Sequence, residues 1–335
     1  MAGFGPIADL DAWAEAARAE IGDRLVVCSI SGGKDSTAMA LLLKEAGIPF
    51  RSVHIDTGWE HPETDHYVRS YLPTVLGPID IIRRPEGGME ELVLEQAGFP
   101  GGNQRFCTRE LKIKPIRTYL RALSEEPINT VGIRSGESVR RAAMPVWDHS
   151  SALGCAVWRP IKAFSEANVF AMHRRHNVHL NPLYGMGCSR VGCWPCVYAR
   201  KAEIKLLADI DPRRVDLIRH LENQVQKRRE ERNEERGREG GTPPTWFVHK
   251  LASWSIDEVI GWARSEMGAG TFRKALDRTD PNLALKERLA SVQSELFTAP
   301  DREQGCMRWG MCETVSPEEE AEGAFARMWQ LAGQD

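Results

Sequence analysis

The stretch from residue 25 to residue 44 constrains the fold of this chain more than any other. It opens with the apolar run Leu25-Val26-Val27, continues through Ser-Gly-Gly-Lys-Asp-Ser at residues 31–36, and ends in helix formers at 38–44. This order predicts a strand, a tight glycine turn and a helix. Glycines let the backbone approach a ligand, and a helix N-terminus offers N–H groups and partial positive charge. We therefore predict a phosphate cradle, with an ordinary turn as the alternative.

The loop at residues 31–36 is not a Walker A loop, because Asp35 follows Lys34 where that motif has Ser or Thr. It resembles instead the PP-loop of the ATP pyrophosphatases. In that superfamily the loop grips ATP while the bond between the α- and β-phosphates is broken. The resemblance implies an α/β fold of the adenine nucleotide alpha-hydrolase type, with a doubly wound, mostly parallel sheet.

Length and charge limit the class of protein. A chain of 335 residues can hold a large α/β domain with an appendage, and we expect a nucleotide-binding domain over 1–205 and a helical extension over 206–335. A formal net charge of −3 argues against bulk coating of nucleic acid but leaves room for a local basic groove. Because no apolar run is long enough to span a membrane and no signal pattern opens the chain, we expect a cytoplasmic protein without a membrane partner.

Two further motifs follow predicted strands. Asp-Thr-Gly at residues 56–58 comes after the alternating pattern of residues 50–55, and Gly-x-Arg-x-x-Glu-Ser-x-x-Arg occupies residues 132–141. Alone, the first is a capped turn or a ligand loop, and the second a salt-bridged surface or an anion site. With Asn-Pro-Leu-Tyr at 181–184, they resemble the motifs of the phosphoadenosine phosphosulfate reductase family. The resemblance covers about residues 25–200.

The resemblance also implies roles for these residues, with ATP and Mg²⁺ as cofactors. Lys34 and the loop N–H groups would stabilise charge on the β-phosphate, and Asp35 or Asp56 would hold Mg²⁺. The residues predicted as catalytic are Lys34, Asp35, Asp56 and Arg134. The predicted nucleotide-binding residues are Ser31, Gly32, Gly33, Lys34, Asp35, Ser36, Asp56, Thr57, Gly58, Gly132, Arg134, Glu137 and Arg141.

A cysteine cluster predicts a metal. Cys188, Cys193 and Cys196 have the spacing Cys-x4-Cys-x2-Cys with no histidine nearby, and zinc or a 4Fe-4S cluster would each need one more ligand. Iron-sulfur members of the family carry a Cys-Cys pair where this chain has Cys107 and Thr108. We therefore expect a 4Fe-4S cluster on Cys107, Cys188, Cys193 and Cys196, with zinc as the alternative metal.

The remaining cysteines have less defined roles. Cys306 and Cys312 are alternative fourth ligands or a sulfur-carrying pair, Cys28 is expected in the core, and Cys155 in a loop.

Basic residues gather at 105–121, and Arg190, Arg200 and Lys201 flank the cysteines. This density suits a nucleic-acid strand or an anionic nucleotide, and a solvated helix face is the alternative. A long helix over 213–239 has nearly balanced charge, which favours a solvated helix. The tryptophan-rich segment after Gly240 and Gly241 is expected to be helical and to pack on the main domain.

These features favour an ATP-dependent adenylating sulfurtransferase, similar to the enzyme that adenylates a DNA backbone phosphate in phosphorothioation. Its partners would be an adenine nucleotide, a nucleic-acid phosphate or base, and a cysteine desulfurase as sulfur donor, while the oligomeric state stays open. A reductase making sulfite is the first alternative, although this chain lacks the reductase Glu-Cys-Gly-x-His motif and has Gln304-Gly305-Cys306-Met307 instead. A non-catalytic nucleotide sensor is the second.

Overall fold

The computed structural model describes residues 7–101, 104–238, 244–249 and 252–266. Cys306 and Cys312 lie outside these residues. In the part of the chain that is described, no helix has the length and apolar character needed to cross a membrane. The chain divides into two compact units, which are described separately: the first contains residues 7–89 and 106–194, and the second the described residues of 90–105 and 195–266. The predicted domain boundary after residue 205 stays a prediction.

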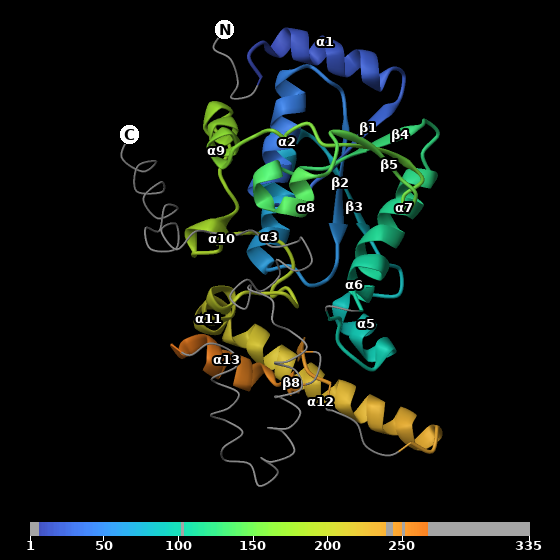
Figure 1. The fold of residues 1–335 in the computed structure, drawn as a ribbon, viewed down its shortest axis with the longest axis vertical. Coiled ribbons are helices and arrows are strands. Elements are labelled where there is room, and N and C mark those ends of the chain that lie inside the picture. Colours follow the sequence, from blue (N-terminus) through green and yellow to red (C-terminus); the bar gives the residue numbers. More distant parts are fainter. Residues whose placement is uncertain (1–6, 102–103, 239–243, 250–251, 267–335) are drawn as a thin grey trace. The chain divides into compact units, whose positions relative to one another are not determined.

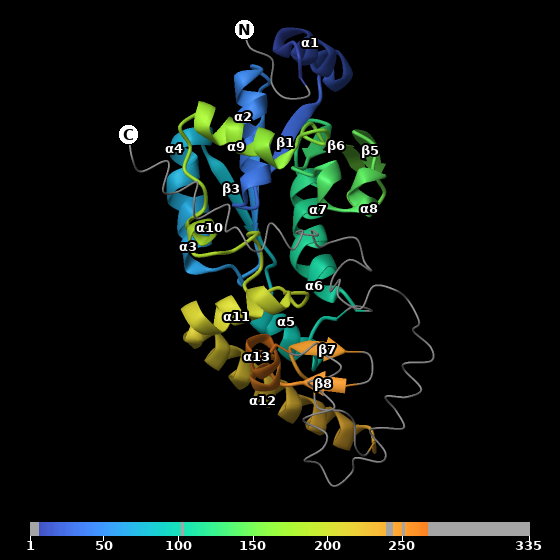
Figure 2. The same ribbon diagram turned by 60° about the vertical axis from the view of Figure 1, so that its left-hand side comes forward.

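A six-stranded sheet forms the centre of the first unit, in the order β3-β2-β1-β4-β6-β5 (Figures 1 and 2). The strands are β1 (Leu25–Ser29), β2 (Arg51–Asp56), β3 (Ile79–Arg83), β4 (Pro127–Thr130), β5 (Trp147–Ser150) and β6 (Cys155–Trp158). All neighbours pair in parallel except β5, which runs antiparallel to β6 at one edge. The prediction of a doubly wound, mostly parallel sheet is confirmed.

The strand order reverses at β1. The chain moves from β1 to β2 on one side, whereas β4 pairs with the other side of β1 through Leu25–Cys28. Ligands of open α/β sheets bind outside the carboxyl ends of the strands at such a switch point. A ligand-binding site is therefore expected at the segments that follow β1 and β4.

The remaining elements of the first unit connect or cover these strands. They are α1 (Leu10–Ile21), α2 (Lys34–Glu45), α3 (Pro62–His66), the π-helix η1 (Tyr67–Tyr71), α4 (Leu72–Leu76), α6 (Phe106–Thr108), the π-helix η2 (Arg109–Ile113), α7 (Lys114–Arg121), the 3-10 helix η3 (Ser135–Glu137), α8 (Val139–Ala142), α9 (Glu166–Arg175) and α10 (Pro182–Gly185). The helix predicted after the loop at 31–36 corresponds to α2.

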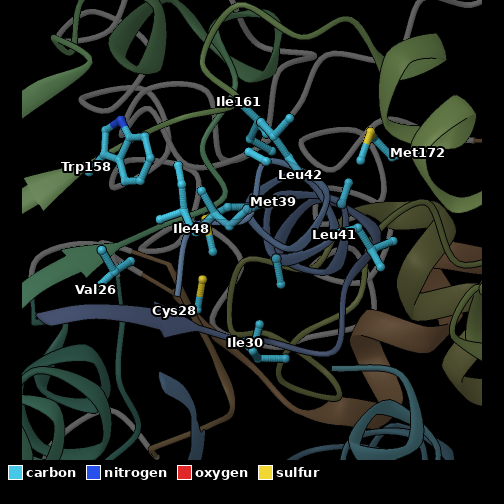
Figure 3. Packing of buried hydrophobic residues seen from close by; sticks show 14 of the residues in the cluster. Val26, Cys28, Ile30, Met39, Leu41, Leu42, Ile48, Trp158, Ile161 and Met172 are labelled. Atoms are coloured by element: carbon cyan, nitrogen blue, oxygen red, sulfur yellow. The ribbon is translucent and has the colours of Figure 1, made fainter. Parts of the chain in front are cut away.

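The larger core lies between β1 and α2 (Figure 3). Met39, Leu41 and Leu42 of α2 are fully buried, and Figure 3 shows them in the same cluster as Cys28 of β1. Burying one such apolar side chain contributes about 1.5–3 kcal/mol, so this packing fixes where α2 begins relative to the strand. Cys28 is 0% exposed, and burial raises the pKa of its thiol, which confirms its expected place in the core.

The second unit contains a two-stranded hairpin that the sequence did not predict. Its elements are α5 (Met89–Gln96), α11 (Lys201–Ile210), α12 (Pro212–Glu235), β7 (Phe247–His249), β8 (Ala252–Trp254) and α13 (Ile256–Arg264). The expectation of helix throughout the tryptophan-rich segment is therefore wrong for β7 and β8. The run Phe247-Val248 combines an aromatic with a β-branched residue, and both types favour strands.

The long charged helix predicted over 213–239 is α12. Arg228 and Glu231, three residues apart, form an ion pair with 3.1 Å between nitrogen and oxygen. Arg232 points instead to α5, where its two Nη atoms donate to the carbonyl oxygens of Glu95 and Gln96. A guanidinium at this position satisfies carbonyl groups that a helix C-terminus leaves without intrahelical partners.

One buried carboxylate joins α12 to the hairpin and α13. Glu222 is 8% exposed, and its oxygens accept the N–H groups of Trp246 at 3.0 Å and Ile256 at 3.1 Å. Burial raises the pKa of Glu222 above its ordinary value, and the two backbone donors offset this only in part.

Replacing Glu222 by Gln should remove a pH-dependent component of the stability of this unit. A carboxyl whose pKa is raised on folding contributes stability that is complete below the unfolded pKa and is lost as pH rises through the folded pKa. Protection of the amides of Trp246 and Ile256 against hydrogen exchange, corrected for intrinsic exchange, should therefore fall over that window in the wild type and less in Glu222→Gln. Glu234→Gln, on an exposed part of the same helix, is the control; identical pH profiles for all three proteins would contradict the assignment.

Candidate active site

The loop between β1 and α2 is built from its own side chains. The Oγ of Ser36 accepts the N–H of Ser31 at 3.1 Å and donates to the carbonyl of Gly33 at 3.1 Å. The Ser31 hydroxyl lies 3.0 Å from the Oγ of Ser36, and the Ser31 hydroxyl also accepts the N–H of Gly33 at 3.3 Å. The predicted residues 31–36 thus form a closed turn that continues into the first turn of α2.

Gly32 is required by both conformation and space. Its φ of +78° is one that residues with a side chain rarely adopt, and a Cβ there would lie 2.8 Å from a methyl of Val68. The backbone of the loop therefore packs directly against η1.

Residues 181–184 hold the loop from outside. The Nδ2 of Asn181, a residue that is 1% exposed, donates to the carbonyl of Gly32 at 3.1 Å and to the hydroxyl of Thr64 at 3.2 Å. The hydroxyl of Tyr184 accepts the N–H of Lys34 at 3.0 Å. The contacts of this motif with the loop at residues 31–36 were not predicted from the sequence. Asn before Pro signals a helix start, which Asn181 also caps, but no sequence signal indicates the distant partner.

His173 of α9 is a further residue that the sequence analysis missed. Its Nε2 lies 2.9 Å from the carbonyl oxygen of Lys34, so the hydrogen bond requires Nε2 to carry the proton. Burial lowers the pKa of His173 from its ordinary value and favours the neutral ring.

Three residues predicted as catalytic meet at the start of α2. The Nε of Arg134 lies 2.5 Å from Oδ1 of Asp35, and the Nζ of Lys34 lies 3.4 Å from Oδ2 of the same carboxylate. The Lys34 ammonium also lies 3.2 Å from Oε1 of Glu166 and over the ring of Tyr184. Lys34 is only 1% exposed, which places its charge among paired groups rather than in solvent.

The segment after β4 packs closely against the first turn of α2. A Cβ at Gly132 would lie 2.8 Å from the backbone nitrogen of Ser36 and 2.9 Å from the carbonyl group of Asp35. Further along, Glu137 accepts the N–H of Arg134 at 2.9 Å and forms an ion pair with Arg141. The predicted residues of 132–141 are thereby connected to those of 31–36.

Asp56 is engaged in holding its own loop. Its Oδ1 accepts the N–H of Gly58 at 2.7 Å, and its Oδ2 lies 2.7 Å from a guanidinium nitrogen of Arg69. Thr57, which is buried, donates its hydroxyl to Glu60 at 2.6 Å. The structure does not bring Asp56 into the hydrogen-bonded group around Asp35, and its role in Mg²⁺ binding stays a prediction.

The loop that follows β2 is also joined to the cysteine segment. Glu60 and Cys193 form an isolated antiparallel bridge, and the N–H of Trp194 donates to the carbonyl of Trp59 at 2.8 Å. Cys188 is buried, and its N–H donates to the carbonyl of Leu183 at 3.0 Å. The residues that follow the Asp-Thr-Gly motif thus lie directly against the cysteine loop.

The four predicted cysteine ligands belong to the described residues. Cys107, Cys188 and Cys193 lie in the first unit and Cys196 in the second, and the described cysteines are thiols. Among the described residues, no group of three or more His, Cys, Asp or Glu side chains that could hold a metal ion is found. The four-cysteine ligand set stays a prediction.

Part of the basic charge predicted at 105–121 is neutralised internally. Arg109 and Lys114 both form ion pairs with Glu110, and the hydrogen bond from Lys114 lowers the pKa of that carboxyl. These cations are therefore engaged with a neighbouring side chain, in addition to any role toward an anionic ligand.

Known proteins are similar to this chain in sequence. The model of the phosphoadenosine phosphosulfate reductase domain matches residues 25–199. An uncharacterized 37.8 kDa protein of Escherichia phage 186 is 36% identical over 229 residues, covering 53% of this chain and 68% of that protein. The adenosine 5'-phosphosulfate reductase of Allochromatium vinosum is 28% identical over 187 residues, covering 52% of this chain and 68% of that enzyme. The phosphoadenylyl-sulfate reductase of Candida auris, solved as a phosphate complex, has a TM-score of 0.45 and 19% identity, covering 55% of this chain and 88% of that one.

The sheet order and the loop between β1 and α2 define a PP-loop nucleotide-binding fold of the adenine nucleotide alpha-hydrolase type. Within that class, this chain belongs to the phosphoadenosine phosphosulfate reductase domain family, because the family model covers more than half of its residues.

Replacing Gly132 by Ala should destabilise the fold through the first turn of α2. The added carbon would overlap backbone atoms of Asp35 and Ser36, and overpacking of this kind costs about 1–3 kcal/mol. The measurement is the free energy of unfolding in urea. Gly192→Ala is the matched control, because a Cβ there meets nothing within 4 Å, and it should change stability by less than about 0.5 kcal/mol. Equal stability of the two variants would contradict the close approach.

Proposed function

We propose that this chain is an ATP-dependent adenylating enzyme that breaks the bond between the α- and β-phosphates of ATP. The observation that carries the proposal is the assembly of the complete Ser-Gly-Gly-Lys-Asp-Ser loop at the switch point of the sheet, with Arg134 brought to Asp35. A loop that keeps every residue of the ATP-gripping motif, and fixes each of them by hydrogen bonds, is what nucleotide use requires.

The proposed reaction is a nucleotidyl transfer. An oxygen of the acceptor attacks the α-phosphorus, the bond to the β-phosphate breaks, and pyrophosphate leaves while AMP stays on the acceptor. The N-terminus of α2 and the N–H groups of the loop would stabilise the negative charge of the phosphates. Lys34 and Arg134 supply cationic groups beside this N-terminus. Asp35 and Asp56, the predicted ligands of Mg²⁺, each hold an arginine in this structure, so no step is assigned to a metal.

The finer proposal is that adenylation prepares the acceptor for sulfur. The terminal sulfur of a persulfide, supplied by a cysteine desulfurase, displaces AMP from a nucleic-acid phosphate or base, and a second thiol then reduces the resulting disulfide. The backbone bridge between Glu60 and Cys193 supports this proposal, because it joins the segment that carries this cysteine to the turn after the Asp-Thr-Gly motif.

Radiolabelled ATP tests the adenylation. The wild type should release pyrophosphate and transfer label to its acceptor, and Asp35→Ala and Asp35→Asn should reduce both by at least about 100-fold, as loss of preorganised electrostatic groups does. Asp23→Asn, which makes the same change on an exposed residue, should keep wild-type rates. Full pyrophosphate release by the Asp35 variants would overturn the proposal.

Reduction of an adenylyl sulfate is the second candidate, favoured by the 28% identity to the Allochromatium vinosum enzyme. Incubation with adenosine 5'-phosphosulfate and a thiol reductant separates the two: sulfite without pyrophosphate from ATP identifies a reductase. Nucleotide binding with neither product identifies a sensor.

The metal hypothesis has its own test. After anaerobic purification, a 4Fe-4S protein contains iron and acid-labile sulfide, and Cys188→Ser and Cys193→Ser should lose both, whereas Cys155→Ser should not. Cys155 lies in β6 and not in the loop expected from the sequence, and it stands outside residues 188–196, which makes it the matched control. A colourless protein with one zinc would contradict the iron-sulfur hypothesis and leave the cysteines as zinc ligands.

A further inference from the structure

Every polar group of Lys34 is engaged by residues 166–184. Its N–H donates to the hydroxyl of Tyr184 at 3.0 Å, its carbonyl lies 2.9 Å from Nε2 of His173, and its ammonium lies 3.2 Å from the carboxylate of Glu166. The first of these contacts comes from α10 and the other two from α9. No motif in the sequence pointed to Glu166.

The helix α9 presents Glu166 and His173 to the same residue. They are seven positions apart, so they lie on one face of the helix, and that face packs along α2 (Figures 1 and 2). Ser165 caps the helix and forms a capping box with Asn168, which fixes the first turn where Glu166 stands. The carboxylate is therefore placed by a rigid element and not by a loose loop.

The charges explain why a carboxylate is needed there. A buried ammonium is costly without partners, and Lys34 at 1% exposure has Asp35 and Glu166. With Arg134, these groups sum to zero formal charge. A polyphosphate that binds at this site adds negative charge beside the two carboxylates. One of the carboxylates must then move away from the Lys34 ammonium.

Glu166 is the carboxylate that can yield. Asp35 is also held by Arg134 and its side chain is 17% exposed. Glu166 pairs with Lys34 alone among the described residues, and its side chain is 42% exposed. Moving it into water therefore breaks one contact and needs no further rearrangement.

We propose that Glu166 is an affinity-determining positioning residue, which neutralises Lys34 in the nucleotide-free protein and is displaced by the phosphates of the bound nucleotide. The inference rests on the proposed function in one respect, namely that an anionic nucleotide binds at the loop of residues 31–36. It adds that the Glu166 carboxylate competes with the phosphates of the nucleotide for the Lys34 ammonium.

The test is the affinity for ATP of Glu166→Gln, measured by calorimetry in EDTA so that metal binding does not contribute. Gln keeps the size of the side chain and removes the competing charge, so the dissociation constant should fall about three- to tenfold. Structural damage at the site would raise it instead. Glu166→Asp, which keeps the charge, should stay within about twofold of the wild type. Glu15→Gln, the same change on an exposed residue of α1, is the control and should bind like the wild type.

An unchanged or weaker affinity of Glu166→Gln, with a melting temperature like that of the wild type, overturns the inference. Equal tightening in Glu15→Gln also overturns it, because net charge alone would then explain the effect. If the wild type does not bind ATP, the proposed function fails, and the same series is measured with adenosine 5'-phosphosulfate, since the argument needs only a phosphate-bearing nucleotide. Binding of neither nucleotide overturns both.

Discussion

The ion pair between the buried Lys34 ammonium and its carboxylates is the interaction on which the rest of this site depends. A cation that is 1% exposed can be kept at the N-terminus of a helix, where the helix dipole opposes it, only if anions surround it. Asp35 supplies one anion from the same turn, and Glu166 supplies the other from α9. The contact of α9 with α2 therefore combines this ion pair with apolar packing.

The same turn is fixed by contacts from other directions. Gly132, after β4, approaches the backbone of Asp35 and Ser36, and Asn181 holds the carbonyl of Gly32. These contacts come from segments far apart in the sequence, which the order of the strands brings to the carboxyl ends of β1 and β4. A loop held in this way loses little conformational entropy when it binds a ligand, which is the physical meaning of a preorganised site.

The sequence predicted the local parts of this arrangement well. Strand, glycine turn and helix over residues 25–44 follow from neighbouring residues, so β1 and α2 could be predicted, as could the parallel sheet through the resemblance to a family. The roles of Tyr184, His173 and Glu166 could not, because each depends on a contact with Lys34 from a distant segment. The hairpin of β7 and β8 could not be predicted, because each strand has three residues, too few to show the alternating pattern of a strand. The cysteine spacing predicts a metal but does not identify the complete ligand set, since spacing alone does not say which thiols converge, and that prediction stays untested.

The contacts of Glu60 join the turn after β2 to the loop that contains Cys193. Its carboxylate accepts the N–H groups of Thr57 and Trp59, which fixes the turn after β2, while its backbone bridges to Cys193. The adjacent hydrogen bond between Trp194 and Trp59 extends the bridge. Because the turn and the cysteine loop share these bonds, a displacement of one must be followed by the other or break them. The backbone position of Cys193 is therefore set by the same residues that form the turn after β2.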